Sequence, residues 1–145
     1  MLRSTKIKIL SWIILVVLVL WLWRAYGPGL PVEVTLGETG IVELYVQQKS
    51  GVMVEFEAQV ERLLADDKEG SPHQRFILVL NNGHTLLVSH NLELADRVPL
   101  KVRDRIRVRG EYEYNEQGGL VHWTHRDPGV SGRHGWIELA GIRYD

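Results

Sequence analysis

The chain has 145 residues, of which 45% are hydrophobic, and a formal net charge of −1. Without a membrane segment, about a hundred residues remain, which is enough for one small domain with a single core but not for two lobes around a cleft. The sequence has no cysteine, which excludes disulfides, thiolate catalysis and cysteine-ligated zinc. After Arg24 it carries 13 basic and 18 acidic side chains. This acidic balance argues against a general polyanion binder, so nucleic-acid binding would require a local basic patch.

Residues 1–26 predict a cytoplasmic tip followed by a single transmembrane helix. Every residue in 9–23 is apolar except Ser11. A helix over 6–26 would be about 30 Å long, which matches the hydrocarbon thickness of a bilayer. Three basic residues precede the apolar run and only Arg24 closely follows it, which predicts a cytoplasmic N-terminus and a domain beyond the membrane. A cleaved signal peptide is the alternative, but the bulky sequence Trp-Leu-Trp-Arg-Ala-Tyr after the run lacks a small-residue cleavage site.

Residues 27–50 are predicted to form a linker that contains one short helix. The sequence Gly-Pro-Gly-Leu-Pro at its start is a stiff, non-helical exit from the bilayer. Thr39 is placed to cap an amphipathic helix that has Ile41 and Leu44 on one face.

Residues 51–145 predict a mainly β domain, because hydrophobic and polar residues alternate along most of it. The sequence Asn82-Gly83 is a strong hairpin signal, and Leu92–Val98 is predicted to form one or two helical turns. The predicted strands are Val52–Leu64, Gln74–Leu80, His84–His90, Val102–Asn115, Gly119–Thr124 and Trp136–Tyr144. Five or so strands in about ninety residues, with a small helix between the third and fourth, predict a small barrel like the oligonucleotide/oligosaccharide-binding (OB) fold.

Several short motifs occur in a fixed order along this predicted domain. They are Asp66-Asp67, His73-Gln74-Arg75-Phe76, His90-Asn91, Gly110-Glu111-Tyr112-Glu113, Gly118-Gly119-Leu120-Val121-His122-Trp123-Thr124-His125, Asp127-Pro128 and Gly135-Trp136-Ile137. On these residues the stretch from about Gln48 to Tyr144 resembles the DUF3465 proteins, an uncharacterised bacterial family. The His-Trp-Thr-His string is a specific part of the match. The resemblance implies no known activity, and in a bacterium the predicted domain would lie on the periplasmic side of the inner membrane.

Histidines cluster in the second half of the chain. Four of them are candidates for metal ligands or general acid–base groups: His73, His90, His122 and His125. Neutral imidazoles from different strands suit a divalent transition metal such as zinc, and histidine transfers protons readily near neutral pH. Spacing is weak support, because His122 and His125 would point to opposite faces of a continuous strand. Hydrogen-bonded structural histidines are the alternative, although apolar residues would fill a core without needing so many polar partners.

The hairpin that precedes the His-Trp-Thr-His string decides which carboxylate lies beside it. A three-residue loop pairs Tyr112 with His122, whereas a two-residue loop places Glu113 there. In the first register Glu111 lies opposite Trp123. Both registers bring a carboxylate next to an imidazole that it would orient, and the sequence does not choose between them.

A run of arginines has a period of two, which places Arg103, Arg105, Arg107 and Arg109 on one face of a strand. The last three, with Trp123, are candidates for binding the phosphates of a nucleic acid or another polyanion. A solvated face with acidic cross-strand neighbours, or a face turned toward lipid headgroups, is the alternative, and the acidic balance of the domain favours it.

The pair Asp66-Asp67 comes shortly before His73 and Arg75. Two carboxylates with His and Arg are the parts of a metal-assisted phosphodiesterase, in which Arg75 would hold the anion and Asp127 or Glu111 would orient a histidine. An ordinary acidic turn has the same composition. The sequence lacks the motifs of serine hydrolases, P-loop enzymes and dinucleotide-binding enzymes.

Three functions are compatible with these observations. The first is a His-centred phosphodiester or nucleic-acid site, with or without a metal. The second is a non-catalytic OB-type module that binds nucleic acid, oligosaccharide or an envelope protein, and the third is a structural role in an envelope complex. Convergence of the candidate histidines would favour an enzyme, and their dispersal would favour a binding module.

Overall fold

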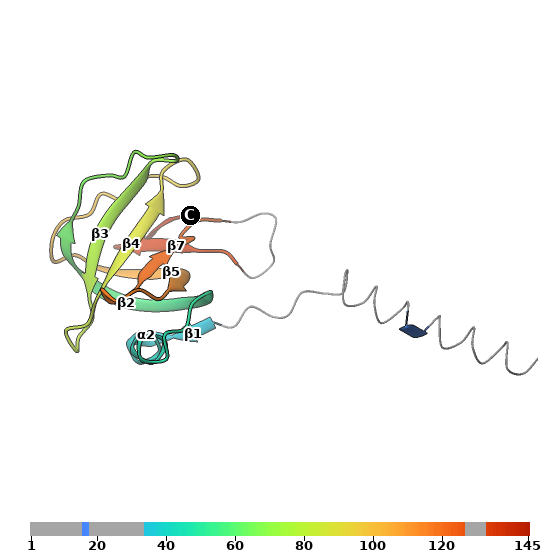
Figure 1. The fold of residues 1–145 in the computed structure, drawn as a ribbon. Helices are drawn as coiled ribbons and strands as arrows, with labels where there is room; N and C mark the ends of the chain where they lie inside the picture. The colour runs from blue at the N-terminus through green and yellow to red at the C-terminus, as the bar shows by residue number, and fades with distance from the viewer. Residues whose placement is uncertain (1–15, 18–33, 127–132) are drawn as a thin grey trace, which may run out of the picture. The chain divides into compact units, whose positions relative to one another are not determined.

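The computed structural model describes residues 16–17, 34–126 and 133–145 of the chain (Figure 1). Contacts divide the chain into two compact units, Met1–Pro31 and Val32–Asp145. Apart from Val16 and Val17, the predicted anchor at 1–26 lies outside the described residues. None of the helices in the described ranges has the length and apolarity needed to cross a bilayer.

Five strands of the second unit close into a barrel. They are β2 (Val52–Leu63), β3 (His73–Val79), β4 (Thr85–Asn91), β5 (Arg105–Glu113) and β6 (Leu120–His122). The order around the barrel is β2-β3-β4-β6-β5, and β5 pairs with β2 to close it. Strands β4 and β6 run parallel, and the other pairs are antiparallel. The prediction of a mainly β domain is therefore confirmed, and the closed five-stranded barrel is consistent with an OB-like fold.

Four further elements flank the barrel: β1 (Val34–Leu36), α2 (Gly37–Val46), β7 (Trp136–Leu139) and β8 (Ile142–Tyr144). Strand β1 pairs with β2, and β7 pairs with β5 (Figure 1). Strand β8 pairs with β7. The compact unit thus begins at Val32, and it includes β1 and α2 from the segment predicted as a linker. Helix α2 starts at Gly37, so Thr39 lies in its first turn and does not precede it as a cap.

The stretch Leu92–Val98, predicted as one or two helical turns, forms a single turn, with Ala95 N donating to Asn91 O over 3.2 Å. One prediction about local structure differs from what is observed, because the C-terminal segment is a hairpin and not one strand. Its turn falls at Ala140 and Gly141, which both have positive φ, 51° and 82°.

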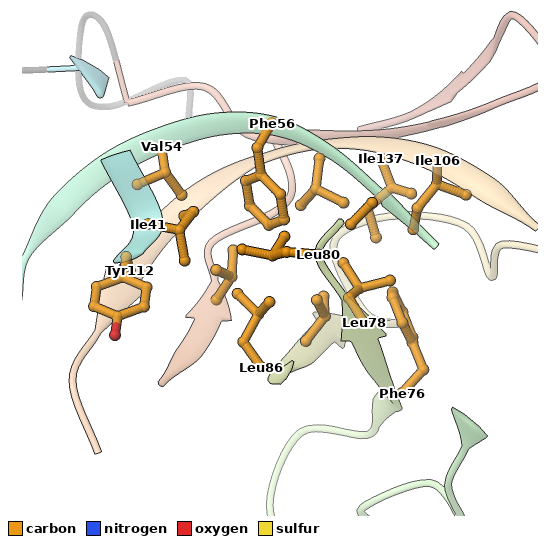
Figure 2. Packing of buried hydrophobic residues seen from close by; sticks show 14 of the residues in the cluster. Ile41, Val54, Phe56, Phe76, Leu78, Leu80, Leu86, Ile106, Tyr112 and Ile137 are labelled. Carbon is orange, nitrogen blue, oxygen red and sulfur yellow. The ribbon is translucent and has the colours of Figure 1, made fainter. Parts of the chain in front are cut away.

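The core fills the interior of the barrel. Every second residue of the barrel strands points inward. Helix α2 contributes Ile41 (Figure 2) and Leu44 to the same core. Figure 2 shows Phe76, Leu78 and Leu86 of β3 and β4 facing Phe56 of β2 across this interior. Because alternate residues are used inside, the remaining positions of each strand are available on the outer face of the barrel.

Candidate functional site on the outer face of strand β5

Strand β5 presents a row of charged residues on its outer face. Its inward positions, Ile106, Val108, Gly110 and Tyr112, are buried, so the alternate positions Arg105, Arg107, Arg109, Glu111 and Glu113 point outward. The row therefore changes from basic to acidic along one strand.

The basic half of this row is paired with acids on the neighbouring strand β2. Arg105 Nε lies 2.8 Å from Glu57 Oε1, and Arg107 Nη2 lies 2.9 Å from Glu55 Oε1. Arg109 Nη1 lies 3.3 Å from Glu55 Oε2. This arrangement corresponds to the alternative of acidic cross-strand neighbours, and exposed pairs of this kind each contribute about 0–1 kcal/mol.

The acidic half of the row faces β6 in a register that neither predicted loop gives. Glu111 pairs with His122, Tyr112 with Val121 and Glu113 with Leu120. The connecting loop is longer than predicted, because Asn115 Oδ1 accepts bonds from the backbone N–H groups of Gln117 and Gly119, at 2.9 and 3.0 Å. The wider loop places the Glu111 carboxylate directly across from His122.

Strand β6 ends in a sharp kink at the His-Trp-Thr-His string. Trp123 has a φ of 55°, which is uncommon for a bulky residue, so the chain leaves the sheet there. Thr124 is fully buried, and its hydroxyl is 2.8 Å from His90 Nδ1. The chain returns at Gly135, whose N–H donates to His125 O over 2.9 Å.

Glycine is required at two positions where this kink crosses β5. A Cβ added to Gly135 would lie 1.8 Å from Trp123 O, and one added to Gly110 would lie 2.4 Å from His122 O. Both contacts are with backbone atoms, which cannot move aside cheaply. The close crossing holds β6, the kink and β7 against the same edge of β5.

Two carboxylates and one imidazole meet where β5 faces β6. His122 Nε2 lies 3.9 Å from Glu111 Oε1 and 3.9 Å from Glu113 Oε1. Arg133, on the returning chain, places Nη2 at 2.6 Å from Glu111 Oε2. Its guanidinium carbon lies 5.4 Å from the centre of the Trp123 ring. We refer to Glu111, Glu113 and His122 as the acidic-histidine cluster.

Burial leaves polar atoms of this region without hydrogen bonds. Glu111 is only 8% exposed, and its cross-strand neighbour on β2 is Met53, which is 1% exposed. Three buried side-chain atoms in the described part of the chain have no hydrogen-bond partner: Glu111 Oε2, His122 Nε2 and Trp123 Nε1. Glu111 Oε2 does have the charge of Arg133 beside it, although the contact lacks hydrogen-bond geometry. Native proteins rarely bury such atoms unpaired, so the two that also have no ion pair at hydrogen-bonding distance, His122 Nε2 and Trp123 Nε1, are the exceptional ones.

A pocket of about 540 Å³ lies beside the acidic-histidine cluster. It is lined by Glu55, Arg109, Arg126, His134, Trp136, Arg143 and Asp145. Arg109 is two residues before Glu111 on the same face of β5, and its Nε donates to His134 O over 2.8 Å. Since His134 follows Arg133 directly, the pocket adjoins the cluster along β5, although Glu111, Glu113 and His122 do not line it. We refer to this as the arginine pocket.

Comparison with known proteins places the chain in a family. The DUF3465 family, described as "Protein of unknown function (DUF3465)", matches residues 30–145. The chain belongs to the DUF3465 family. None of the curated proteins matches it. Among solved structures, the S. pombe Stn1-Ten1 complex is similar, with a TM-score of 0.37 and 16% identity over 65% of this chain and 72% of the other.

In the described part of this DUF3465 protein, the four histidines predicted as a metal site do not form one group of ligand atoms. Within the described ranges, the one group of three or more ligating residues with atoms inside 4.8 Å of one another is the acidic-histidine cluster. Of the four candidates it includes only His122. His73 Nδ1 donates to Ser71 O over 2.6 Å, and the buried His125 donates through Nδ1 to Arg126 O over 3.1 Å.

His90 is fully buried, and both of its ring nitrogens have partners within the protein. Nε2 donates to Asp96 O over 3.0 Å, so Nδ1 accepts from the Thr124 hydroxyl in a neutral ring. Burial lowers the pKa of His90, and the charges of His125 and His73 lower it further, against the raising effect of the bond to Asp96. His90 therefore ties β4 to the kink as a neutral structural group.

Other predicted residues lie away from the cluster or outside the described ranges. Arg75 donates through Nε to Ala65 O over 3.1 Å, and Asp66 forms an ion pair with Arg97. Asp127 lies outside the described residues. Trp123 is beside the cluster, as its contact with Arg133 shows.

The sequence indicates some residues of the site and not others. It indicates Glu113, because the outward positions of the strand recur every two residues after Glu111. Arg133, Trp136 and Arg143 were missed, since only the return of the chain to β5 brings them close, and no local pattern marks that return. Among the arginines predicted for polyanion binding, Arg109 lines the arginine pocket, whereas Arg105 and Arg107 do not.

The neutral state of His90 predicts a dependence of stability on acid. Its pKa in the folded protein lies below the ordinary 6.5 of an unfolded chain, so the unfolded state binds more protons below neutral pH. The free energy of unfolding should be fully retained above about pH 7 and fall as the pH drops through 6.5 toward the folded pKa, by at most about 1.4 kcal/mol per pH unit. Urea unfolding of the wild type and of His90→Gln between pH 5 and 7.5 checks this. The variant should show the shallower slope, and equal slopes would contradict the assignment.

Proposed function

We propose that the DUF3465 domain binds nucleic acid, through its phosphodiester groups, in the arginine pocket. The observation that carries this proposal is the pocket of about 540 Å³ with Arg109, Arg126 and Arg143 in its wall. Against these three cations the lining has the carboxylates of Glu55 and Asp145. The local balance is therefore basic within an acidic domain, as a site for a phosphate requires.

The arginines are held in defined positions by the protein. Arg143 Nε lies 3.0 Å from Glu138 Oε2, and its guanidinium carbon is 4.1 Å from the centre of the Trp136 ring. Arg126 Nη2 lies 2.9 Å from Asp145 Oδ2. A guanidinium has five N–H donors, and one carboxylate occupies at most two of them. Such paired arginines keep donors for a phosphate, and less side-chain entropy is lost when it binds.

Hydrolysis of the ligand at His122 is the second candidate function, favoured by the acidic-histidine cluster beside the pocket. The imidazole would accept a proton from a water that attacks the phosphorus, and the P–O ester bond to the leaving group would break. The imidazolium, stabilised by the carboxylates of Glu111 and Glu113 at 3.9 Å, would then give the proton to the leaving oxygen. His73, His90 and His125 contribute no ligand atom to this cluster, so this candidate chemistry depends on His122.

We also propose that residues 1–26 anchor the domain in the cytoplasmic membrane and that the domain lies outside the cytoplasm. The support is the charge asymmetry around the apolar run of the sequence. In this position the arginine pocket would meet nucleic acid, oligosaccharide or an envelope protein outside the cell's cytoplasm.

Removing one pocket arginine should weaken oligonucleotide binding. For the full chain in mild detergent, fluorescence anisotropy with a labelled single-stranded oligonucleotide should give a higher Kd for Arg143→Gln. The slope of log K against log salt should also fall by about one, because one phosphate contact is lost. Arg105→Gln is the matched control, since Arg105 is also an outward arginine paired with a glutamate but is absent from the pocket lining. Equal weakening by both variants would contradict binding in the pocket.

His122→Ala separates hydrolysis from binding. If the second candidate function holds, this variant should lose cleavage of the labelled oligonucleotide while its Kd stays within about twofold of the wild type, because His122 does not line the pocket. Gel analysis of the reaction and anisotropy of the same sample measure the two effects. A wild-type chain that binds without cleaving would leave the binding module as the function.

A topology test addresses the anchor. Alkaline phosphatase fused after Asp145 of the full chain should be active in bacterial cells, because the enzyme folds productively only when it is exported. Deletion of residues 1–26 from the fusion should abolish this activity. An inactive but intact full-length fusion would place the domain in the cytoplasm and contradict the proposal.

A further inference from the structure

The acidic-histidine cluster has the composition and spacing of a metal site. Its three ligand atoms, from two adjacent strands, all lie within 4.8 Å of one another. Two carboxylate oxygens and one imidazole nitrogen are ligands that divalent first-row transition ions accept together. The set differs from the four histidines predicted from sequence, since it replaces three of them with Glu111 and Glu113.

Contacts within the protein do not explain the arrangement. An N–H···O hydrogen bond spans about 2.7–3.2 Å, and His122 Nε2 lies 3.9 Å from each carboxylate. This nitrogen is buried and has no hydrogen-bond partner in the described part of the chain. At 3.9 Å from each carboxylate, the buried nitrogen leaves space for an ion between the three groups. A hydrogen-bonded pair is too close together to leave such space.

The charges around the cluster attract a cation. Glu111 and Glu113 together contribute two negative charges, and Arg133 contributes one positive charge at Glu111 Oε2. Arg133 therefore occupies one oxygen of Glu111, while Oε1 is the oxygen that faces His122. A second group that holds the far oxygen of a ligating carboxylate is a common feature of metal sites, because it fixes the orientation of the ligand.

We propose that Glu111, Glu113 and His122 bind one divalent first-row transition ion, such as Zn²⁺ or Mn²⁺. Ligand bonds of about 2.1 Å at a tetrahedral angle hold two ligand atoms about 3.4 Å apart, so the two separations of 3.9 Å between His122 and the carboxylates would shrink by about 0.5 Å on binding. Three protein ligands leave the ion an open coordination position, as in catalytic sites. Magnesium is disfavoured, because it prefers oxygen ligands throughout. The proposal goes beyond binding of a phosphodiester, since its three residues do not line the arginine pocket. It shares these residues with the second candidate function, and an ion on His122 Nε2 would prevent that nitrogen from accepting a proton.

Metal binding by the full chain tests the inference directly. The purified protein, treated with chelator and then dialysed in mild detergent, is titrated with ZnCl₂ or MnCl₂ by calorimetry. We expect about one ion bound per chain, with a rise in Tm on addition of metal. Glu113→Gln and His122→Gln should each raise the Kd for the metal at least about tenfold. Removing a group that only hydrogen-bonds a metal ligand already weakens metal binding by about this factor, and removing the ligand itself should weaken it at least as much. Cobalt substitution adds a second readout, since the visible d–d spectrum of bound Co²⁺ should change in His122→Gln.

Controls separate the site from other surface groups and from misfolding. Glu57→Gln and His73→Gln remove a carboxylate and an imidazole elsewhere on the unit and should leave the Kd unchanged. Glu111 is buried and paired with Arg133, so Glu111→Gln risks unfolding, whereas Glu113 is 36% exposed and Glu113→Gln should keep the metal-free Tm. Unchanged binding in both Glu113→Gln and His122→Gln, or the absence of metal binding by the wild type, would overturn the inference.

The outcome is independent of the proposed function. A chain that binds metal but no oligonucleotide would support the metal site and reject phosphodiester binding. A chain that binds or cleaves oligonucleotide equally well with chelator, and takes up no metal, would reject the metal site and leave the proposed function in place.

Discussion

The site depends on the way in which strand β5 shares one of its edges between two partners. Its other edge pairs with β2 along most of its length and closes the barrel. The shared edge pairs with β7 at 106–109 and with β6 at 111–113. Gly110 lies at the division, where a side chain would strike the backbone of His122. The chain between β6 and β7 therefore leaves and returns at one point, and this geometry places Arg133 beside Glu111 and His134 beside Arg109.

Charge along the outer face of β5 follows the same division. Before Gly110 the arginines face glutamates of β2, and Arg107 also has Glu138 of β7 at 3.8 Å. Beyond Gly110 the cross-strand neighbour of Glu111 on β2 is Met53, which supplies no charge. Among the described residues, the ion pair of Arg133 with Glu111 is the one that an arginine or lysine forms with Glu111 or Glu113. The basic half is thus neutralised by the sheet itself, whereas the acidic half keeps a negative excess that a cation or a protonated imidazole would balance.

The sequence predicts the barrel well because its evidence is local. The alternation of hydrophobic and polar residues indicates which face of β2, β3, β4 and β5 points inward. The dipeptide Asn82-Gly83 indicates the hairpin between β3 and β4. The family match was equally recognisable, since short motifs recur in order. Elements whose definition depends on tertiary packing were less predictable: α2 reads as part of a linker from its composition, yet Ile41 and Leu44 complete the core.

The site was predicted only in part, because its geometry depends on long-range contacts. The register between Glu111 and His122 is set by Asn115, whose side chain organises a longer loop than either predicted one. For His90 the geometry corresponds to the alternative of a hydrogen-bonded structural histidine, because both of its ring nitrogens have partners, Thr124 and Asp96, at the junction of β4 with the kink. His122 differs, because its buried Nε2 has no hydrogen-bond partner among the described residues.

The position of the site also distinguishes this chain from a simple five-stranded barrel. The barrel closes through the β2–β5 pairing without β7 and β8, yet Trp136 and Arg143 of these two strands line the arginine pocket. The kink at Trp123 and the return at Gly135 bring this hairpin onto β5. The crowding at Gly110 belongs to the pairing of β5 with β6 in the barrel, whereas the positive φ at Trp123 and the crowding at Gly135 arise where the chain leaves and rejoins β5. This path of the chain places a basic pocket and an acidic-histidine cluster on one face of β5.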